Sequence, residues 1–490
     1  MNRPIRVMAI ACLVLFVALM ANINYVQYVD ADDLNARPGN NRVLHDEFSR
    51  DRGPIIVGRH QIALSVPVND EFDYQRTYRQ VNLYANLTGF YSYINGATDL
   101  ESSQNSILSG SDPRLFVNRV IDLLSSEQSK GGSVELTINP QAQRAAYDGL
   151  RNLAEGSKGA VVALNPSTGA IQAMVSVPGY NPNKLASHDF NAAADAYQKL
   201  IKDPENPLRD RSREEIYPPG STFKLVTAAA ALANGYDADS AVDGNDSLSF
   251  PGIDYTLRNE IPCGGGQITM AAALANSCNV AFGDLGLKLG PKKIQAQAEA
   301  FGFGDSSYLD GLSVAPSQFI PPGQPDPEGP QLAQSAIGQY NTAATPLQMA
   351  MVAAGIANDG VVMKPYIVSE VRSPDAEVLE RTTPDDLSDA MTSDDAEQLT
   401  QMMQGVVTSG TASGVANLPA DTAAKTGTAQ RAASQNPYAW FVAFAPATDP
   451  QVAVAVFVQD ASGVARDDIS GSGLAGPIAA DVMNAVLNSE

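Results

Sequence analysis

The residues best suited to chemistry in this chain occur in three short strings, in a fixed order along the sequence. They are Ser221-Thr222-Phe223-Lys224, Ser277-Cys278-Asn279 and Lys425-Thr426-Gly427-Thr428. Each string alone is common by chance. The intervals between them are long enough for whole supersecondary units, so one site can be assembled from three distant segments. Together they offer a serine nucleophile with a lysine base, a second hydroxyl beside an amide, and a cationic group for an anionic substrate.

Ser221 and Lys224 are spaced as a nucleophile and its base. Pro218 and Pro219 cannot continue a helix, so a helix is predicted to begin at Ser221. Positions i and i+3 share one helical face, which makes Ser221 and Lys224 neighbours. A lysine among apolar residues has a lowered pKa and can take the serine proton. The alternatives are a helix cap for Ser221 and a surface position for Lys224; the uncharged run around Lys224 argues against the second.

The second string offers a proton relay. Ser277 and Asn279 flank Cys278, and on a loop between helices both side chains can point into one cleft. We expect Ser277 to pass a proton between Lys224 and the leaving group, and Asn279 to hold Lys224 and a substrate amide. A helix-terminal cap is the alternative interpretation of this string taken by itself.

The third string lies in a strand pattern. Alternation is predicted to place Lys425 and Gly427 on one face and Thr426 and Thr428 on the other. A glycine inside a strand indicates close approach of a ligand to the backbone. A substrate carboxylate would take charge-assisted hydrogen bonds from the lysine and the hydroxyls. The backbone N–H groups of Thr428 and Ser221 are the expected oxyanion donors.

Other catalytic classes are disfavoured by what the sequence lacks. The chain has only His45, His60 and His188, none in the setting of a Ser-His-Asp triad. No His or Cys cluster has metal-ligand spacing, so we expect neither a metal nor another cofactor. The formal net charge of −22 argues against a nucleic-acid partner, which would need a basic face.

Hydrophobic periodicity predicts an α+β protein. Strands are expected over 159–164, 170–176, 423–430, 438–445 and 452–459. They come from both ends of one body, which favours a single, largely antiparallel sheet. The intervening stretch 222–357 is rich in alanine and helical in pattern, so helices should pack on and beside that sheet.

The N-terminus carries an export signal or anchor. The uncharged apolar run 7–21 follows Arg3 and Arg6, a charge pattern that keeps the N-terminus in the cytoplasm and places the remainder outside. The run is short for a spanning helix of ~17–25 residues, which leaves a cleaved signal peptide as the alternative to an anchor. In an oxidising compartment, Cys263 and Cys278 either form a disulfide or remain two buried thiols.

With these motifs the chain resembles the class B penicillin-binding proteins, the monofunctional peptidoglycan transpeptidases, and their actinobacterial members in particular. The likeness extends over nearly the whole chain. Besides the three strings, it is carried by the segments 52–56, 136–138, 159–180, 345–348 and 439–446. The Arg52-Gly53 segment belongs to the N-terminal pedestal of class B proteins and is missing from β-lactamases. No glycosyltransferase segment precedes it, which argues against a bifunctional class A enzyme.

The resemblance implies a penicillin-binding transpeptidase fold with an antiparallel sheet flanked by helices. We expect an anchor over 1–28, a non-catalytic pedestal over 29–155 and the catalytic domain over 156–490, outside a membrane crossed once. It also implies that Ser221 attacks the penultimate D-Ala of a stem pentapeptide on lipid-linked or nascent glycan and expels the terminal D-Ala. β-Lactams would acylate the same serine. The pedestal would contact a SEDS-type glycan polymerase.

Three other functions remain open at this point. A class A β-lactamase needs a deacylating glutamate after the second string, and between Asn279 and Gly360 only Glu299 and Glu328 occur, neither in that setting. A D,D-carboxypeptidase would pass the acyl group to water instead of an amine. A non-catalytic β-lactam-binding scaffold or sensor would keep the fold without turnover.

Overall fold

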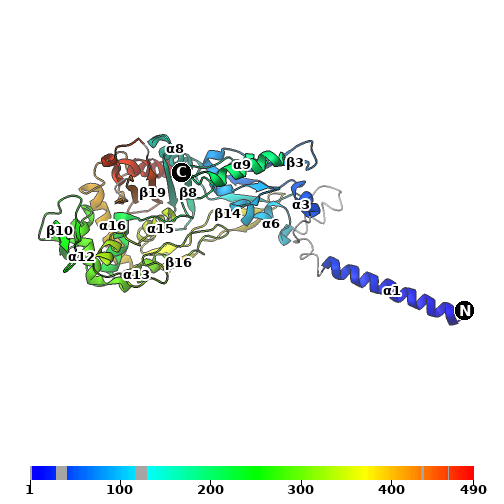
Figure 1. The fold of residues 1–490 in the computed structure, drawn as a ribbon, viewed down its shortest axis with the longest axis horizontal. Coiled ribbons are helices and arrows are strands. Elements are labelled where there is room, and N and C mark those ends of the chain that lie inside the picture. Colours follow the sequence, from blue (N-terminus) through cyan, green and yellow to red (C-terminus); the bar gives the residue numbers. More distant parts are fainter. Residues whose placement is uncertain (1–2, 29–40, 116–129, 432–434, 462, 490) are drawn as a thin grey trace.

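The computed structural model describes residues 3–28, 41–115, 130–431, 435–461 and 463–489. Helix α1 (Arg3–Tyr28) extends away from the rest of the described chain, and the N-terminal body lies between α1 and the catalytic body (Figure 1). Its segment Arg3–Val26 contains an 18-residue window with a mean hydropathy of 2.4, and it is long and apolar enough to cross a membrane. The helix is longer than the run 7–21 suggested, because it continues through its polar flanks.

The catalytic body is built on a five-stranded sheet in the order β17-β18-β19-β7-β8, antiparallel throughout. Its strands are β7 (Lys158–Leu164), β8 (Ile171–Val177), β17 (Ala423–Ala429), β18 (Tyr438–Ala445) and β19 (Val452–Asp460). All five strands predicted from the sequence are therefore confirmed, to within one residue at each end. The three central strands are almost wholly buried, which explains their near-continuous apolar sequences.

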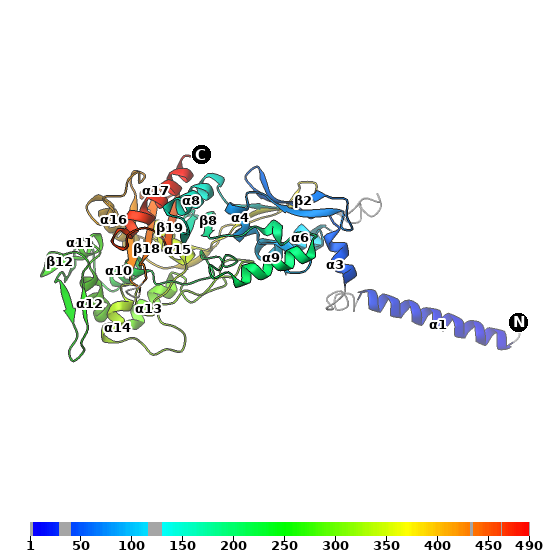
Figure 2. The same ribbon diagram turned by 45° about the horizontal axis from the view of Figure 1, so that its top comes forward.

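Helices cover both faces of this sheet. α8 (Pro140–Leu153) and α17 (Gly476–Leu487) pack together on one face, and α15 (Pro346–Ala357) packs against the other (Figure 2). Beyond α15 lies a helical layer that carries two of the three strings. Its helices are α10 (Lys224–Leu232), α11 (Met270–Ala275), α12 (Asn279–Leu289), α13 (Pro291–Ala300), α14 (Gly329–Ser335) and α16 (Ser393–Thr408).

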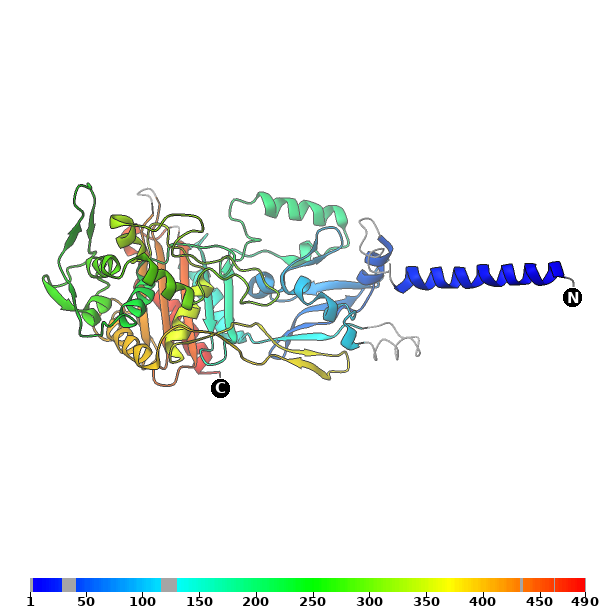
Figure 3. The same ribbon diagram turned by 90° about the horizontal axis from the view of Figure 1, so that it is seen from below.

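The N-terminal body contains a six-stranded sheet in the order β15-β14-β6-β1-β2-β3. Its strands are β1 (Ile55–Val57), β2 (His60–Pro67), β3 (Tyr74–Tyr78), β6 (Ser133–Leu136), β14 (Val368–Arg372) and β15 (Val378–Arg381). Two of these strands come from far along the chain, and β14 pairs with β6 while β6 pairs in parallel with β1. Figure 3 shows this hairpin reaching back from the catalytic body. The pedestal sheet is thus not made by the N-terminal segment alone.

Smaller elements complete the two bodies. Around the pedestal lie α3 (Asn41–Phe48), α4 (Val81–Thr88), α5 (Asp99–Ser103), α6 (Asn105–Leu108), α9 (Phe190–Lys202), β4 (Tyr91–Ser92) and β5 (Gly96–Ala97). Three two-stranded ribbons belong to the rest: β9 (Ala241–Asp243) with β12 (Gln267–Thr269), β10 (Ser247–Ser249) with β11 (Thr256–Arg258), and β13 (Val361–Met363) with β16 (Asp386–Asp389).

The Arg-Gly segment of the pedestal is fixed by a buried ion cluster. Arg52 and Arg76 each donate to the carboxylate of Glu101, at 2.7 Å and 2.6 Å, and Tyr78 donates to it at 3.1 Å. Burial alone would raise the pKa of Glu101, but the two guanidinium groups outweigh burial and hold the pKa below its ordinary value. An ionised carboxylate bridging two arginines therefore ties β3, α5 and the start of β1 together.

Candidate active site

Ser221 lies in a tight turn that packs against the C-terminal end of β17, although the two are distant in sequence. A helix begins at Gly220, one residue before the predicted start at Ser221, but its first turn, Gly220–Phe223, is 3₁₀ and α10 begins at Lys224. No side chain caps this turn, and the residue before it is Pro219, which disfavours the capping interpretation. In a 3₁₀ turn, positions i and i+3 eclipse, so Ser221 and Lys224 still share one face.

Glycines allow this turn to sit against the sheet. Gly220 has φ of 54°, and a Cβ atom there would lie 2.9 Å from the Thr428 carbonyl oxygen. A Cβ atom on Gly427 would lie 2.9 Å from Thr222 Cγ2 and 3.0 Å from the Pro219 carbonyl oxygen. The close approach expected at Gly427 is therefore made by the protein's own turn rather than by a ligand. This packing brings the first and third strings together.

Lys224 is fully buried, and its amine is held by the second string. Nζ donates to the Ser277 carbonyl oxygen at 2.7 Å and to Asn279 Oδ1 at 2.7 Å, and it lies 3.3 Å from Ser277 Oγ. Burial, and secondarily the positive charge of Lys425, lower the pKa of Lys224 well below its ordinary value, against the opposing charge of Glu260. Uncharged lysine is the form that can act as a base.

The geometry around Nζ leaves its lone pair free. An uncharged amine has two N–H groups and one lone pair, and the two oxygen atoms at 2.7 Å account for both N–H groups. The lone pair is left for a hydroxyl, either Ser277 Oγ or the Ser221 hydroxyl on the preceding turn. Among the described residues, no hydrogen bond yet joins Ser221 to Lys224. A base often reaches hydrogen-bonding distance of its nucleophile only when substrate is bound.

Ser277 connects the two buried lysines. It lies in the tight connection between α11 and α12 with φ of 58°, a left-handed conformation that is strained for serine. Its Oγ accepts a hydrogen bond from Lys425 Nζ at 2.9 Å, while facing Lys224 Nζ on its other side. A hydroxyl between two amines can accept a proton from one and donate a proton to the other. The expected relay through Ser277, between Lys224 and the leaving group, stays a prediction.

Lys425 is more deeply buried than expected for a group that binds a substrate carboxylate directly. Its side chain is fully buried, and Nζ also donates to the Thr426 carbonyl oxygen at 2.9 Å. Burial lowers the pKa of Lys425 to about 7, against the charge of Glu260. Thr426 Oγ1 shares a hydrogen bond of 2.6 Å with Thr411 Oγ1. Of the third string, Thr428 is the residue that lines the open cavity.

The three strings border one cavity of about 500 Å³. One residue from each string lines it directly, namely Ser221, Asn279 and Thr428. The remaining walls are formed by Tyr255, Leu257, Arg258, Asn259, Glu260, Gln334, Ile337, Gln339 and Gln430. The sequence interpretation missed these wall residues. Five of them, from Tyr255 to Glu260, lie just before Cys263, and the possible disulfide between that cysteine and Cys278 was the signal that could have located them.

The structure joins Cys263 and Cys278 by a disulfide, with a Cα–Cα distance of 6.1 Å. Two hydrogen bonds strengthen the same attachment: Asn279 Nδ2 donates to the Arg258 carbonyl oxygen at 3.1 Å, and the Val280 backbone N–H donates to Asn259 Oδ1 at 2.9 Å. The wall segment is therefore fixed to the second string at Cys278 and Asn279, and to the residue that follows it, Val280. Asn279 in turn is held between this wall and Lys224.

Comparison with known proteins identifies the family of this chain. Residues 159–484 match the family model of the penicillin-binding protein transpeptidase domain, and residues 52–134 match that of the penicillin-binding protein A dimerisation domain. The chain is 43% identical to the peptidoglycan D,D-transpeptidase PbpA of Mycolicibacterium smegmatis, over 99% of both chains. It is 40% identical to PbpA of Mycobacterium tuberculosis strain H37Rv, over the full length of both.

Solved structures show the same likeness. Penicillin-binding protein A of M. tuberculosis, as its ceftriaxone acyl-enzyme complex, superposes with a TM-score of 0.85 at 38% identity, covering 90% of this chain and all of the other. Its penicillin G acyl-enzyme complex superposes with a TM-score of 0.83 at 40% identity, covering 89% of this chain and all of the other. The chain therefore belongs to the class B penicillin-binding protein family, as its three strings and its pedestal segment predicted.

Proposed function

We propose that this protein is a peptidoglycan D,D-transpeptidase whose nucleophile is Ser221. The observation that carries the proposal is the setting of Lys224: a fully buried amine one turn from Ser221, whose pKa is lowered well below its ordinary value by burial and which donates hydrogen bonds to the Ser277 carbonyl oxygen and to Asn279 Oδ1. Such an amine can take the Ser221 proton as the hydroxyl attacks the penultimate D-Ala carbonyl of a stem pentapeptide. The relatives named above carry this activity in their names.

Backbone N–H groups bind the oxyanion, and Ser277 and Lys224 carry out the later proton transfers. As the tetrahedral intermediate forms, its oxyanion lies against the backbone N–H groups of Ser221 and Thr428. Ser277 then donates its proton to the nitrogen of the departing D-Ala and is reprotonated from the lysine that received the Ser221 proton. The C–N bond breaks and a Ser221 ester remains. An amine of a second stem attacks this ester, loses a proton to the same relay, and releases Ser221.

The third string binds the carboxylate end of the donor. The proposed partners for the terminal D-Ala carboxylate are the hydroxyls of Thr426 and Thr428, with Lys425 supplying positive charge behind them. In the unliganded structure Thr426 is bonded to Thr411 and Lys425 to Ser277. Substrate binding would therefore exchange the Thr411 hydrogen bond for one to the carboxylate. β-Lactams present a carboxylate and a strained amide in the same relation and would acylate Ser221.

Intact mass of the full-length protein with and without benzylpenicillin tests the assignment, beside Ser221→Ala. We expect an adduct of one drug molecule on wild type, stable for many minutes, and none on the variant. Rapid hydrolysis of the drug would establish a β-lactamase instead. An adduct without any transfer of a donor peptide to an amine would leave a carboxypeptidase or a β-lactam sensor, which the release of D-Ala distinguishes.

Helix α1 is the basis for the proposed location of the protein in the cell. We propose that α1 anchors the chain in the cell membrane by a single span, with the pedestal (29–155) and the catalytic domain (156–490) outside. The packing of α8 on the catalytic sheet, and of β14 and β15 in the pedestal sheet, modifies these two domain limits. We also propose that the pedestal contacts a SEDS-type glycan polymerase. The test is whether the full-length protein, with α1 intact, co-purifies with the polymerase. Deletion of the β14–β15 hairpin of the pedestal should abolish this co-purification.

A further inference from the structure

The cavity of Ser221 must receive two substrates of opposite charge if the protein is a transpeptidase. The donor brings a carboxylate, for which Thr426, Thr428 and Lys425 are the proposed partners. The acceptor brings a primary amine, which is protonated at neutral pH when it is carried on an aliphatic chain. The catalytic groups described above supply positive charge and hydrogen bonds to the donor, but they offer no negative charge to this second substrate.

Glu260 supplies a carboxylate in the right cavity. Among the described residues that line the cavity, Glu260 is the one acidic residue, and Arg258 is the one basic residue. The Glu260 side chain is exposed, and within the described part of the chain it forms no hydrogen bond or ion pair, either with Arg258 or with any other residue. A carboxylate without a paired cation keeps its charge available to a ligand.

The charge of Glu260 acts on the groups that carry out the chemistry. Burial lowers the pKa of Lys224 and of Lys425, and the negative charge of Glu260 opposes this lowering in both. The same carboxylate therefore acts through space on both amines. Because Ser277 Oγ lies against both amines, a cation held by Glu260 would be on the side of the cavity where the relay exchanges protons.

The relay is also the place at which the acceptor nitrogen must arrive. In the proposed reaction, Ser277 gives a proton to the nitrogen of the departing D-Ala. Attack of an amine on the Ser221 ester is the reverse of that expulsion, with a different amine. The incoming nitrogen therefore occupies the position that the leaving nitrogen has vacated, beside the same hydroxyl.

The segment that carries Glu260 is attached to the second string on both sides. Before Glu260, the Arg258 carbonyl oxygen accepts a hydrogen bond from Asn279 Nδ2 at 3.1 Å, and after it Cys263 is bonded to Cys278. These attachments limit how far the backbone at Glu260 can move from the relay. A group that positions a substrate needs such support.

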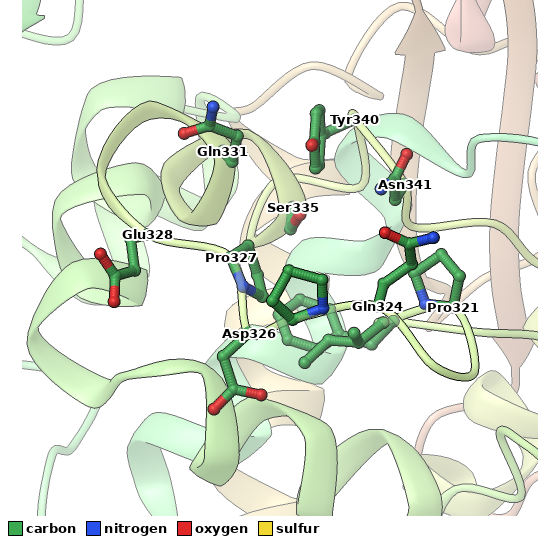
Figure 4. A pocket seen from close by; sticks show the side chains of 12 residues that line it. Pro321, Gln324, Asp326, Pro327, Glu328, Gln331, Ser335, Tyr340 and Asn341 are labelled. Atoms are coloured by element: carbon green, nitrogen blue, oxygen red, sulfur yellow. The ribbon is translucent and has the colours of Figure 1, made fainter.

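The other cavity bordered by α14 offers no comparable group. Its volume is about 390 Å³, and it is lined in part by the proline-rich loop 315–330. Figure 4 shows the carboxylates of Asp326 and Glu328 pointing away from each other and from this cavity. None of its lining residues belongs to the three strings. Of these two cavities, the one at Ser221 therefore combines a carboxylate with the nucleophile.

We propose that Glu260 is the acceptor residue of this active site: it binds the protonated amine of the second stem and takes the proton that this amine must lose before it can attack. The inference rests on the transpeptidase function proposed above. The exposed carboxyl group then releases that proton to solvent. The nitrogen forms a bond to the ester carbonyl carbon, its next proton passes through Ser277 and Lys224 to the Ser221 oxygen, and the bond between that oxygen and the carbonyl carbon breaks.

The partition of one acyl-enzyme between amines and water tests this role. Full-length protein in detergent is acylated with an N-acyl-D-alanyl thioester, and the amide and acid products are measured by mass spectrometry. One acceptor is Nα-acetyl-L-lysine amide, whose amine is charged at neutral pH, and the other is hydroxylamine, which is uncharged. In Glu260→Gln we expect the ratio of amide to acid to fall about tenfold or more with the charged amine, and by no more than about twofold with hydroxylamine.

Asp254→Asn is the matched control, because it removes an exposed carboxylate from the same segment but outside the cavity lining, and it should behave as wild type does with both amines. An unchanged ratio with the charged amine in Glu260→Gln would overturn the proposal. An equal fall with both amines would also overturn it, since Glu260 would then act only through its charge on the two lysines. Wild type that forms the acyl-enzyme but transfers it to water alone would contradict the transpeptidase function, and the acceptor role with it.

Discussion

Arg213 of the catalytic body donates a hydrogen bond to the carboxylate of Asp99, at the start of α5 in the pedestal. Arg213 is 1% exposed and also pairs with Asp210 at 3.1 Å and with Glu214 at 3.3 Å. Three carboxylates thus share one guanidinium at the junction of the two bodies. Burial, together with the neighbouring acids, raises the pKa of Asp99 to about 6 despite Arg213.

This pKa makes the junction sensitive to mildly acidic pH. A carboxylate whose pKa is higher in the folded protein than in the unfolded chain contributes stability when protonated and loses it as pH rises through the folded value. Between about pH 4 and 7 we expect wild type to lose about 3 kcal/mol relative to Asp99→Asn, which cannot ionise. Denaturant unfolding of both proteins at several pH values measures this difference. A difference that does not vary with pH would refute the raised pKa.

Acylation should depend on pH through the two buried lysines. The pH dependence of the acylation rate constant divided by the dissociation constant of the drug reports the ionisation of groups in the free enzyme. It should rise as Lys224 loses its proton, and fall near pH 7 as Lys425, the proposed carboxylate partner, loses its own. Because the lysines interact, the two limbs belong to the pair. In Lys425→Arg the descending limb should disappear, since arginine stays charged, although the maximum rate falls. A descending limb unchanged in this variant would exclude Lys425 as its origin.

Much of the catalytic body could be predicted because its signals are local. Each strand of the five-stranded sheet is an apolar run bounded by turn residues, and the strings at Ser221, Ser277 and Lys425 carry their chemistry in residues a few positions apart. The burial of Lys224 was visible in the uncharged residues around it. The structure adds the contacts that only folding produces, such as the turn of Gly220 against Thr428.

The pedestal was harder to predict because its stabilising contacts are distant in sequence. β14 and β15 complete its sheet from a region that the sequence assigned to the catalytic domain. Glu101 is hydrogen-bonded to Arg52, which lies 49 positions away in the sequence, and Asp99 is hydrogen-bonded to Arg213, which lies 114 positions away. A single acidic residue in a polar segment gives no sign that it will be buried against arginine. The same limit explains why Glu260 went unnoticed in the cavity wall.

Ser277→Ala should separate binding from proton transfer. The substitution removes the hydroxyl between Lys224 and Lys425 but keeps the backbone carbonyl that holds Lys224. We expect acylation by benzylpenicillin to slow by about 10²- to 10⁴-fold, because general acid–base catalysis contributes that much, with little change in thermal stability. Stopped-flow acylation with Ser306→Ala, an exposed serine, as the control measures the effect. Acylation at the wild-type rate would show that Lys224 acts on Ser221 without Ser277.

Loss of the disulfide should affect both stability and the site. Cys263 and Cys278 enclose a loop of about 15 residues, for which chain entropy predicts about 3 kcal/mol of stabilisation. In Cys263→Ala with Cys278→Ala the wall carrying Arg258 and Glu260 loses its covalent attachment to Cys278 but keeps the hydrogen bonds to Asn279 and Val280. We therefore expect lower unfolding free energy and slower acylation. Reduced wild type should behave as the double variant does, and reductant should not affect the variant further. Full acylation after reduction would show that the hydrogen bonds alone position Asn279.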